Sequence, residues 1–199
     1  AIALVAIVIL SGSVYTPISL YKWNDEFSSW SGLDGLHYIA LIQPDEAAGA
    51  SWLRQHAEPD DVILESPGCS YGDEHGLPHN RISMSTGLPT VIGWTGHERQ
   101  WRLQQERLLA EIPQRLDHVR QIYERSGDAE VAEYIERYGI QYIIVGVHER
   151  DGYADCTVGP PYDGVDTRGL EQLGWYPAME AGDVVIYTYG QAPGTSGAN

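Results

Sequence analysis

The chain opens with a run of hydrophobic positions that no charge interrupts. Residues 1–10 are all apolar, and the first charged side chain is Lys22. A complete membrane span needs about 20 apolar residues, so this pattern predicts the end of a transmembrane helix and a juxtamembrane segment over residues 1–22. Aromatic residues, which collect where a bilayer meets water, accompany and follow it: they are Tyr15, Tyr21, Trp23, Phe27 and Trp30. The alternative is a buried N-terminal core helix of a soluble protein.

The flanks of this run predict its origin and its sidedness. The chain begins with Ala1 and has no basic residues ahead of the apolar run, which argues against an intact signal peptide and favours a truncated final span. Lys22 is the only basic residue at the exit, whereas a cytoplasmic flank usually carries several. We therefore expect a cell-membrane protein whose remaining residues lie on the extracytoplasmic side.

Helical and strand-like patterns alternate beyond the apolar run. Residues 44–58 begin with a proline and two acids and then present an apolar face, which predicts a helix. The apolar run 62–64 predicts a short strand that ends at Glu65. Residues 66–80 are rich in glycine and proline, which predicts a long loop. Residues 90–93 then form either another strand or an extended segment.

The second half of the chain continues this alternation. Residues 97–123 carry an apolar stripe that Pro113 interrupts, which predicts two helices or one kinked helix. The later elements are expected in this order: a helix over 128–138, a buried strand over 140–145, a short helix over 167–173, and a hairpin of strands 175–179 and 184–189.

These elements together predict an α/β fold. We expect a mixed, mostly parallel sheet flanked by helices, with an antiparallel C-terminal edge, preceded by the end of a transmembrane helix. A chain of 199 residues suffices for one such domain. The domain should cover residues 23–190, after the membrane segment 1–22 and before a disordered tail over 191–199.

Charge and cysteine content narrow the classes of partner. The chain has 12 Lys and Arg against 28 Asp and Glu, a formal charge of -16. This excess repels phosphate backbones, so we expect no nucleic-acid partner. Cys69 and Cys156 match no zinc or redox spacing. Two free thiols are the simpler expectation, and one disulfide is the alternative if folding brings them together.

Familiar catalytic motifs are absent. His97-Glu98 begins like a zinc-protease helix, but Trp101 stands where the second histidine is required. No serine nucleophile elbow, phosphate-binding loop or dinucleotide fingerprint is present. One loop gathers four polar residues that are better explained by solvation than by a metal: Asp73, Glu74, His75 and His79. We therefore expect no cofactor and no metal in this chain.

Residues 93–102 carry the densest candidate chemistry. A loop enters a helix there with two indoles, an imidazole, a carboxylate and two guanidinium groups. Aromatic faces together with forked donors suit a sugar ring or a phosphate. In the alternative interpretation, Trp94 and Trp101 fill the core while Glu98 and Arg102 pair with Arg81 or Glu65. A second His-Glu-Arg tripeptide at 148–150 predicts an arginine–carboxylate pair that orders a loop.

Several strings resemble one family when taken together. They are residues 33–35, 50–53, 63–68, 70–71, 81–102, 142–146 and 149–153, and the stretch 85–94 with His97 and Glu98 is the most specific. The chain resembles the C-terminal segment of the Chlor_Arch_YYY family of multi-spanning membrane proteins. Members of this family look like relatives of the GT-C membrane glycosyltransferases, which take sugar from a polyprenyl-phosphate carrier and place their C-terminal domains outside the cytoplasm.

The resemblance implies a role for this region, with two departures from the pattern. Gly32 and Leu103 stand where threonine and glycine are expected. The catalytic carboxylate of the GT-C pattern lies in an early external loop, so this segment alone should be inert, and any divalent metal would be bound by other parts of the full-length protein. Its expected partners are its own membrane-spanning domain and a lipid-linked sugar or glycan acceptor.

The candidate substrate-binding residues would position the acceptor or cap the active site; they are Glu65, Tyr71, Arg81, Trp94, His97, Glu98, Trp101 and Arg102. No catalytic residue is assigned. Two alternatives stay open. One is a non-catalytic structural or glycan-binding ectodomain. The other is a freestanding soluble α/β enzyme that uses Glu65 and His97 as acid and base, which would require residues 1–14 to pack against the domain.

Overall fold

The structure, a computed structural model, describes residues 2–28, 34–71, 76–151 and 164–190. The chain divides into two units, residues 1–37 and residues 38–199, and each is described by itself. The tail expected over 191–199 lies outside the described residues.

The first unit is dominated by one apolar helix. Helix α1 (Ile2–Trp23) has 22 residues and is followed by the short 3-10 helix η1 (Asp25–Phe27). At 1.5 Å per residue, α1 extends about 33 Å, against about 30 Å for the hydrocarbon core of a bilayer, and it is long and apolar enough to cross a membrane. None of its residues is buried, and Ile2 and Ile9 are 88% and 61% exposed. A core helix would bury such side chains, whereas α1 buries none of its own.

The second unit is built on a four-stranded mixed sheet. The strands are β1 (Val62–Leu64), β2 (Ile140–Val145), β3 (Trp175–Ala181) and β4 (Val184–Tyr189), in the order β1-β2-β4-β3. Strands β1 and β2 are parallel, while the β2–β4 and β3–β4 pairs are antiparallel. The predicted mixed sheet with its antiparallel C-terminal edge is confirmed. Its parallel part is smaller than expected, because residue Thr90 adds only an isolated bridge to Ile63.

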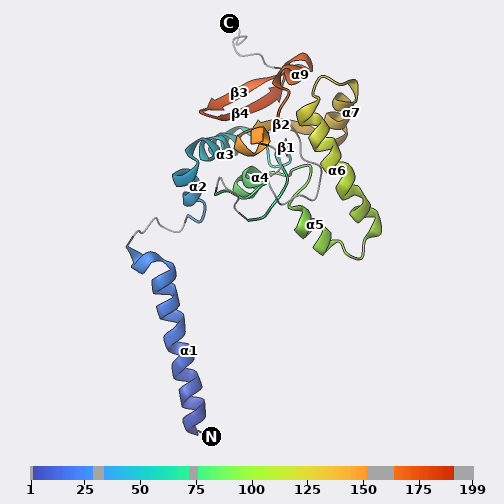
Figure 1. The fold of residues 1–199 in the computed structure, drawn as a ribbon. Coiled ribbons are helices and arrows are strands. Elements are labelled where there is room, and N and C mark those ends of the chain that lie inside the picture. The colour runs from blue at the N-terminus through green and yellow to red at the C-terminus, as the bar shows by residue number, and fades with distance from the viewer. Residues whose placement is uncertain (1, 29–33, 72–75, 152–163, 191–199) are drawn as a thin grey trace. The chain divides into compact units, whose positions relative to one another are not determined.

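Helices cover both faces of this sheet. They are α2 (His37–Ile42), α3 (Pro44–His56), α4 (Arg81–Thr86), α5 (Thr95–Trp101), α6 (Glu106–Glu124), α7 (Ala129–Tyr138), α8 (Val147–Asp151) and α9 (Thr167–Gln172). Figure 1 shows α3 and α4 on one side of the sheet and α6 and α7 on the other.

The alternation of side chains along the strands produces two cores. On β2, Ile143 and Val145 pack with the apolar faces of α6 and α7, while Ile144 packs with α3 and α4. Successive side chains of a strand point to opposite faces, so a central strand covered on both faces is apolar at most positions. The hydrophobic run at residues 140–145 therefore forms a buried central strand, as predicted.

Most predicted elements are confirmed, and two differences have physical causes. The helical stripe breaks at residues 102–105, between α5 and α6, and α6 continues through Pro113. A proline inside a helix removes one hydrogen bond, and the buried face formed by Ile112, Leu116 and Val119 offsets that loss. Helix α4 was not predicted, because it has no apolar stripe of its own.

Deleting residues 1–22 should leave the second unit folded, since α1 contributes no buried side chain. We expect the midpoint of thermal unfolding, followed by circular dichroism, to stay within about 2 °C of that of the intact chain, less than about 1 kcal/mol for a domain of this size. As a positive control, Ile143→Ala should lower the free energy of unfolding by about 2–5 kcal/mol, because it truncates a buried side chain. Loss of cooperative unfolding in the deletion variant would contradict an independent second unit.

Candidate functional site

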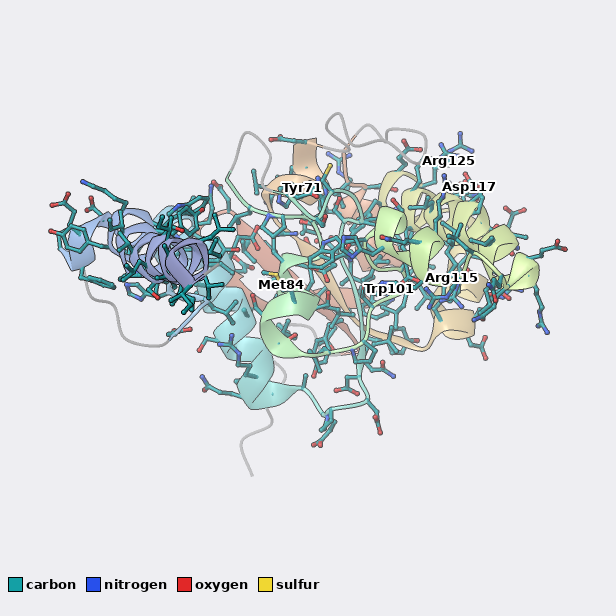
Figure 2. The ribbon with its side chains drawn as sticks, turned by 90° about the horizontal axis from the view of Figure 1, so that it is seen from below. Tyr71, Met84, Trp101, Arg115, Asp117 and Arg125 are labelled. Carbon is teal, nitrogen blue, oxygen red and sulfur yellow. The ribbon has the colours of Figure 1, made fainter. Side chains whose placement is uncertain are left out.

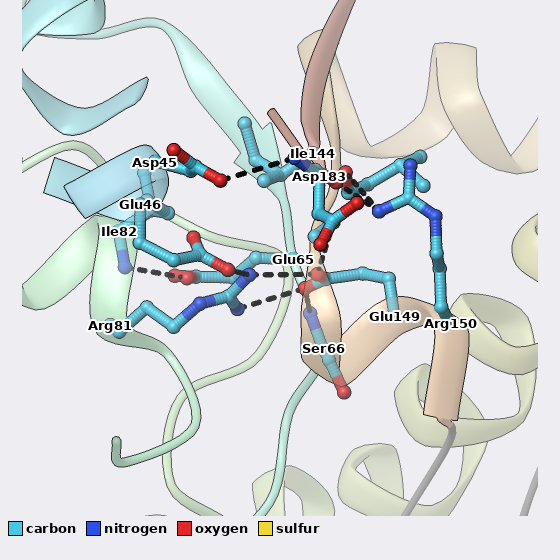
Figure 3. Close-up of polar contacts among 12 residues, drawn as sticks. Asp45, Glu46, Glu65, Ser66, Arg81, Ile82, Ile144, Glu149, Arg150 and Asp183 are labelled. Carbon is cyan, nitrogen blue, oxygen red and sulfur yellow. Dashed lines mark hydrogen bonds and ion pairs between the residues drawn. The ribbon is translucent and has the colours of Figure 1, made fainter. Parts of the chain in front are cut away.

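A buried arginine lies at the centre of the polar interior. Arg81 is the first residue of α4, and its side chain is only 1% exposed. Its Nη1 and Nη2 donate to both oxygens of Glu149 at 3.0 and 2.8 Å, and Nη2 also donates to Glu46 at 2.7 Å (Figure 3). The guanidinium thus joins α4 to α3 and α8, which are far apart in the sequence.

The Glu149 carboxylate also holds two loop backbones. Its Oε1 accepts a hydrogen bond from the Ser66 amide at 2.7 Å, and its Oε2 accepts one from the Gly146 amide at 2.8 Å. A Cβ atom at Gly146 would overlap Glu46 and Arg81, so only glycine fits where β2 leaves the sheet. The loop after β1 and the loop after β2 are therefore fixed to the same charge.

The three buried carboxylates differ in their electrostatics. Burial alone would raise the pKa of Glu149, but the charge and hydrogen bonds of Arg81 lower it to about 2. Burial raises the pKa of Glu46 above its ordinary value, although the same guanidinium opposes the shift. Burial also raises the pKa of Glu65, which accepts hydrogen bonds from the Ile82 and Ser83 amides at the start of α4. One guanidinium therefore keeps Glu149 charged more effectively than Glu46.

A row of aromatic rings leads from this interior toward the surface. The His79 and His148 rings stack at 4.3 Å, and Trp94 Nε1 donates to the His79 carbonyl at 2.6 Å. The Trp94 and His97 rings lie 5.4 Å apart, as do those of His97 and Trp101. Since His148 is 1% exposed and Trp101 is 69% exposed, the row runs from the core to solvent. We call these five residues the aromatic row.

A small pocket lies beside the row, between residues 90–93, α5 and α6. Its volume is about 190 Å³, and its charged residues are Glu98, Arg102, Glu111 and Arg115. Glu98 pairs with Arg102, and Arg115 Nη2 donates to Glu111 at 3.3 Å. Two guanidinium groups thus face two carboxylates. This balanced set of donors and acceptors suits the hydroxyls of a neutral polyol better than an anion, and the volume is below that of most drug-sized sites.

The structure brings together five of the eight candidate residues. Trp94, His97 and Trp101 belong to the aromatic row, and Glu98 and Arg102 line the adjacent pocket. Arg102, which directly follows α5, pairs with Glu98 of that helix, so the alternative interpretation in which these two residues pair with Glu65 or Arg81 is wrong.

The other three candidates lie elsewhere. Glu65 and Arg81 are each 1% exposed and belong to the interior polar cluster. Tyr71 is 79% exposed on the loop after β1, as the labelled side chain in Figure 2 illustrates. Trp101 is exposed as well, so the interpretation that it fills the core is wrong. In a standalone enzyme Glu65 would need a free carboxyl group, but its carboxylate already accepts hydrogen bonds from the backbone of α4.

Sequence reasoning missed Glu46 and gave Glu149 only a loop-ordering role. The His-Glu-Arg tripeptide at 148–150 correctly suggested an arginine–carboxylate pair, but the partner of Glu149 is Arg81, 68 positions away. Glu46 was interpreted only as an acid of a first helical turn. The pocket residues Glu111 and Arg115 gave no signal beyond the spacing of an i, i+4 pair on α6.

The described residues bear on the cysteine expectation and on part of the polar loop. Cys69 is disulfide-bonded, so the expectation of two free thiols is wrong. Cys156, the other cysteine of the sequence, lies outside the described residues, as do Asp73, Glu74 and His75 of the polar loop. Within the described ranges no three His, Cys, Asp or Glu side chains are placed to hold a metal ion.

Comparisons with known proteins find similarity among solved structures. Matching the chain to protein families and to curated proteins yields no match in either case. Among solved structures, the crystal structure of the C-terminal globular domain of an oligosaccharyltransferase from Archaeoglobus fulgidus is similar, with a TM-score of 0.42 and 12% sequence identity. The alignment covers 73% of this chain and 96% of that domain.

The two glutamates that share Arg81 should respond differently to neutralisation. Glu149→Gln leaves the buried guanidinium without its main counter-charge, so we expect a loss of about 3–5 kcal/mol in the free energy of unfolding at pH 7. Glu46→Gln keeps an oxygen for Arg81 and removes a charge that burial opposes, so it should change stability by less than about 1 kcal/mol. Urea unfolding of both variants measures the difference, and equal losses would contradict the assignment.

The pH dependence of the intact chain provides the matching control. The folded pKa of Glu149 is lowered from 4.5 to about 2, so its contribution is present above pH 4.5 and is lost as the pH falls toward 2. The folded pKa values of Glu46 and Glu65 are raised, so their ionisation lowers stability as the pH rises above 4.5. Glu149→Gln should therefore remove much of the fall in the free energy of unfolding below pH 4.5. Glu46→Gln should reduce the fall in the free energy of unfolding above pH 4.5.

Proposed function

We propose that this chain is the extracytoplasmic, C-terminal region of a multi-spanning membrane protein of the GT-C glycosyltransferase type, which uses a polyprenyl-phosphate sugar donor. In this proposal the second unit caps the membrane-embedded active site and positions the acceptor. The resemblance to the Chlor_Arch_YYY family, which covers most of residues 33–190, motivates the enzyme class. The catalytic carboxylate would lie in another part of the protein.

The observation that carries the proposal is the exposure of α1. Its 22 residues include a single cation near the end, Lys22, and no residue is buried. A helix with so much exposed apolar surface is unstable in water unless lipid or protein covers it. A membrane span satisfies this requirement, because lipid covers the apolar side chains while a helix bonds most of its backbone groups within the segment.

Two further features favour an extracytoplasmic position. The exit of α1 has one cation and several aromatic residues, whereas a cytoplasmic exit is usually rich in Lys and Arg. Cys69 is disulfide-bonded, and disulfides persist mainly in oxidising compartments outside the cytoplasm.

The aromatic row and its pocket favour a positioning role over a catalytic one. Trp101 offers an exposed ring face for stacking on a sugar. Arg102 and Glu98, which pair with each other, supply donors and acceptors for hydroxyl groups. A residue that is already paired in this way orients a ligand and does not readily act as a free base.

A second candidate function is a glycan-binding ectodomain without catalysis. The exposed Trp101 and the balanced pocket also support it, because both lie wholly within this chain. The standalone soluble enzyme is not favoured: it would require residues 1–14 to be packed against the domain, and none of the described residues among them is buried.

Membrane attachment and sidedness test the proposal directly. In right-side-out vesicles from cells that make the protein at its natural length, the chain should stay with the membrane after alkaline washing. Added protease should remove residues 38–199, because they face outward. Recovery of the chain in the soluble fraction, or protection of this region in intact but not in permeabilised vesicles, would contradict the proposal.

Sugar binding should depend on the exposed indole. We expect saturation-transfer NMR with methyl glycosides of glucose, mannose, galactose and N-acetylglucosamine to detect binding of at least one sugar to the chain in detergent micelles. Trp101→Ala should weaken that binding about 5- to 50-fold, the equivalent of about 1–2 kcal/mol for one aromatic contact. Trp52→Ala, a matched indole on α3 that stacks on His56, should leave it unchanged. Equal effects of the two variants would argue against a sugar site on the aromatic row.

A further inference from the structure

We propose that one end of the second unit rests in the lipid head-group region of the bilayer. The surface concerned, which we call the membrane face, consists of Leu41 and Ile42 of α2, Met84 of α4, and Trp101 and Leu103 at the end of α5. This inference rests on the proposed function, because it presupposes that α1 spans a membrane. It adds which surface meets the lipid and what recognises it.

The membrane face collects the large apolar side chains that the second unit exposes. Leu41, Trp101 and Leu103 are 72%, 69% and 69% exposed. The other exposed large hydrophobic residues among those described in this unit are all tyrosines, whose hydroxyls can face water. Figure 1 shows α2, α4 and α5 at the end of the unit opposite the β3–β4 hairpin, and Figure 2, seen from that end, labels Met84 and Trp101.

The charge around Trp101 complements lipid phosphates. Between residues 95 and 107 the sequence has three arginines and two glutamates, in a chain whose formal charge is -16. Arg99 is exposed, and the side chain of Arg107 is 93% exposed with only a 3.7 Å contact to Glu111. Indole and leucine side chains flanked by arginines are typical of segments that lie in the interface plane.

The covalent connection limits how far this surface can lie from the bilayer. Helix α1 ends at Trp23 and α2 begins at His37, so the connection comprises residues 24–36. Thirteen residues span at most about 45 Å when fully extended, and the η1 turn shortens that reach. Helix α2 belongs to the membrane face, so this reach is the upper limit that the chain sets on the distance between this face and the end of α1.

Lipid is favoured over a protein partner by the composition of the face. Scattered leucine, methionine and tryptophan side chains bordered by the exposed Arg99 and Arg107 match an apolar and phosphate-rich interface. Such a position would also set Trp101 and the pocket at the depth where the sugar of a lipid-linked donor lies. Contact with other spans of the same protein is the competing occupant, and the experiment separates the two.

Fluorescence quenching in nanodiscs tests the inference. The full chain is reconstituted in phosphatidylcholine nanodiscs with and without brominated lipid, and in discs that also contain phosphatidylglycerol. Trp101→Phe is expected to remove part of the lipid-quenched emission, while Trp52→Phe on α3 should remove none.

Leu103→Glu should lower the quenching of Trp101. Tyr189→Glu, at the exposed end of β4, should leave it unchanged. The anionic lipid should increase the quenching, and Arg99→Gln with Arg107→Gln should abolish the increase.

The Trp23→Phe variant distinguishes this inference from the proposed function. If Trp23 emission is quenched but Trp101 emission is not, α1 lies in lipid while the membrane face does not, and the inference is overturned in favour of contact with other protein spans. If neither is quenched, the membrane span itself fails. Equal quenching of Trp101 with and without anionic lipid would overturn the role of the arginines.

Discussion

A single buried guanidinium is the interaction on which the second unit depends. Arg81 is surrounded by Glu46 and Glu149, while a third buried carboxylate, Glu65, holds the first amides of the same helix. Removing ions from water costs free energy, and ion pairing offsets that cost only when nearly every donor and acceptor makes a hydrogen bond. Glu149 meets this demand by accepting bonds from Arg81, Ser66 and Gly146. The charge thereby fixes the ends of two neighbouring parallel strands, where loops of α/β folds commonly carry function.

The position of the aromatic row follows from that fixed interior. Asn80, next to Arg81, donates its side-chain amide to the Ile92 carbonyl at 2.9 Å, and the indole of Trp94 bonds to the carbonyl of His79. Residues 92–94 are therefore tied to the start of α4 at two points. Helix α5 continues from this anchor and carries Trp101 outward to solvent. A rigid inner end and an exposed outer end suit a surface that orients a ligand or meets a membrane.

Local sequence patterns predicted the parts of the fold that local physics determines. Pro44 with two acids marked α3, Gly139 marked the end of α7, and Gly182 marked the hairpin turn, which requires a positive φ. What could not be predicted depends on distant partners. Helix α4 forms where Glu65 binds its first amides, 17 and 18 positions away in sequence. Likewise, the sequence placed Trp94 and Trp101 in one cluster, but only the fold decides which indole is bonded inside and which is exposed.

Backbone hydrogen exchange at the four amides that the carboxylates hold tests this account most directly. The amides of Ser66 and Gly146 lie in loops, and those of Ile82 and Ser83 lie in the first turn of a short helix, where exchange is ordinarily fast. Because Glu149 and Glu65 accept hydrogen bonds from these amides inside the unit, we predict that all four exchange as slowly as the amides of the central strand β2. Fast exchange at Ser66 and Gly146, with slow exchange in β2, would show that the Arg81 cluster does not hold the loops and would contradict the account.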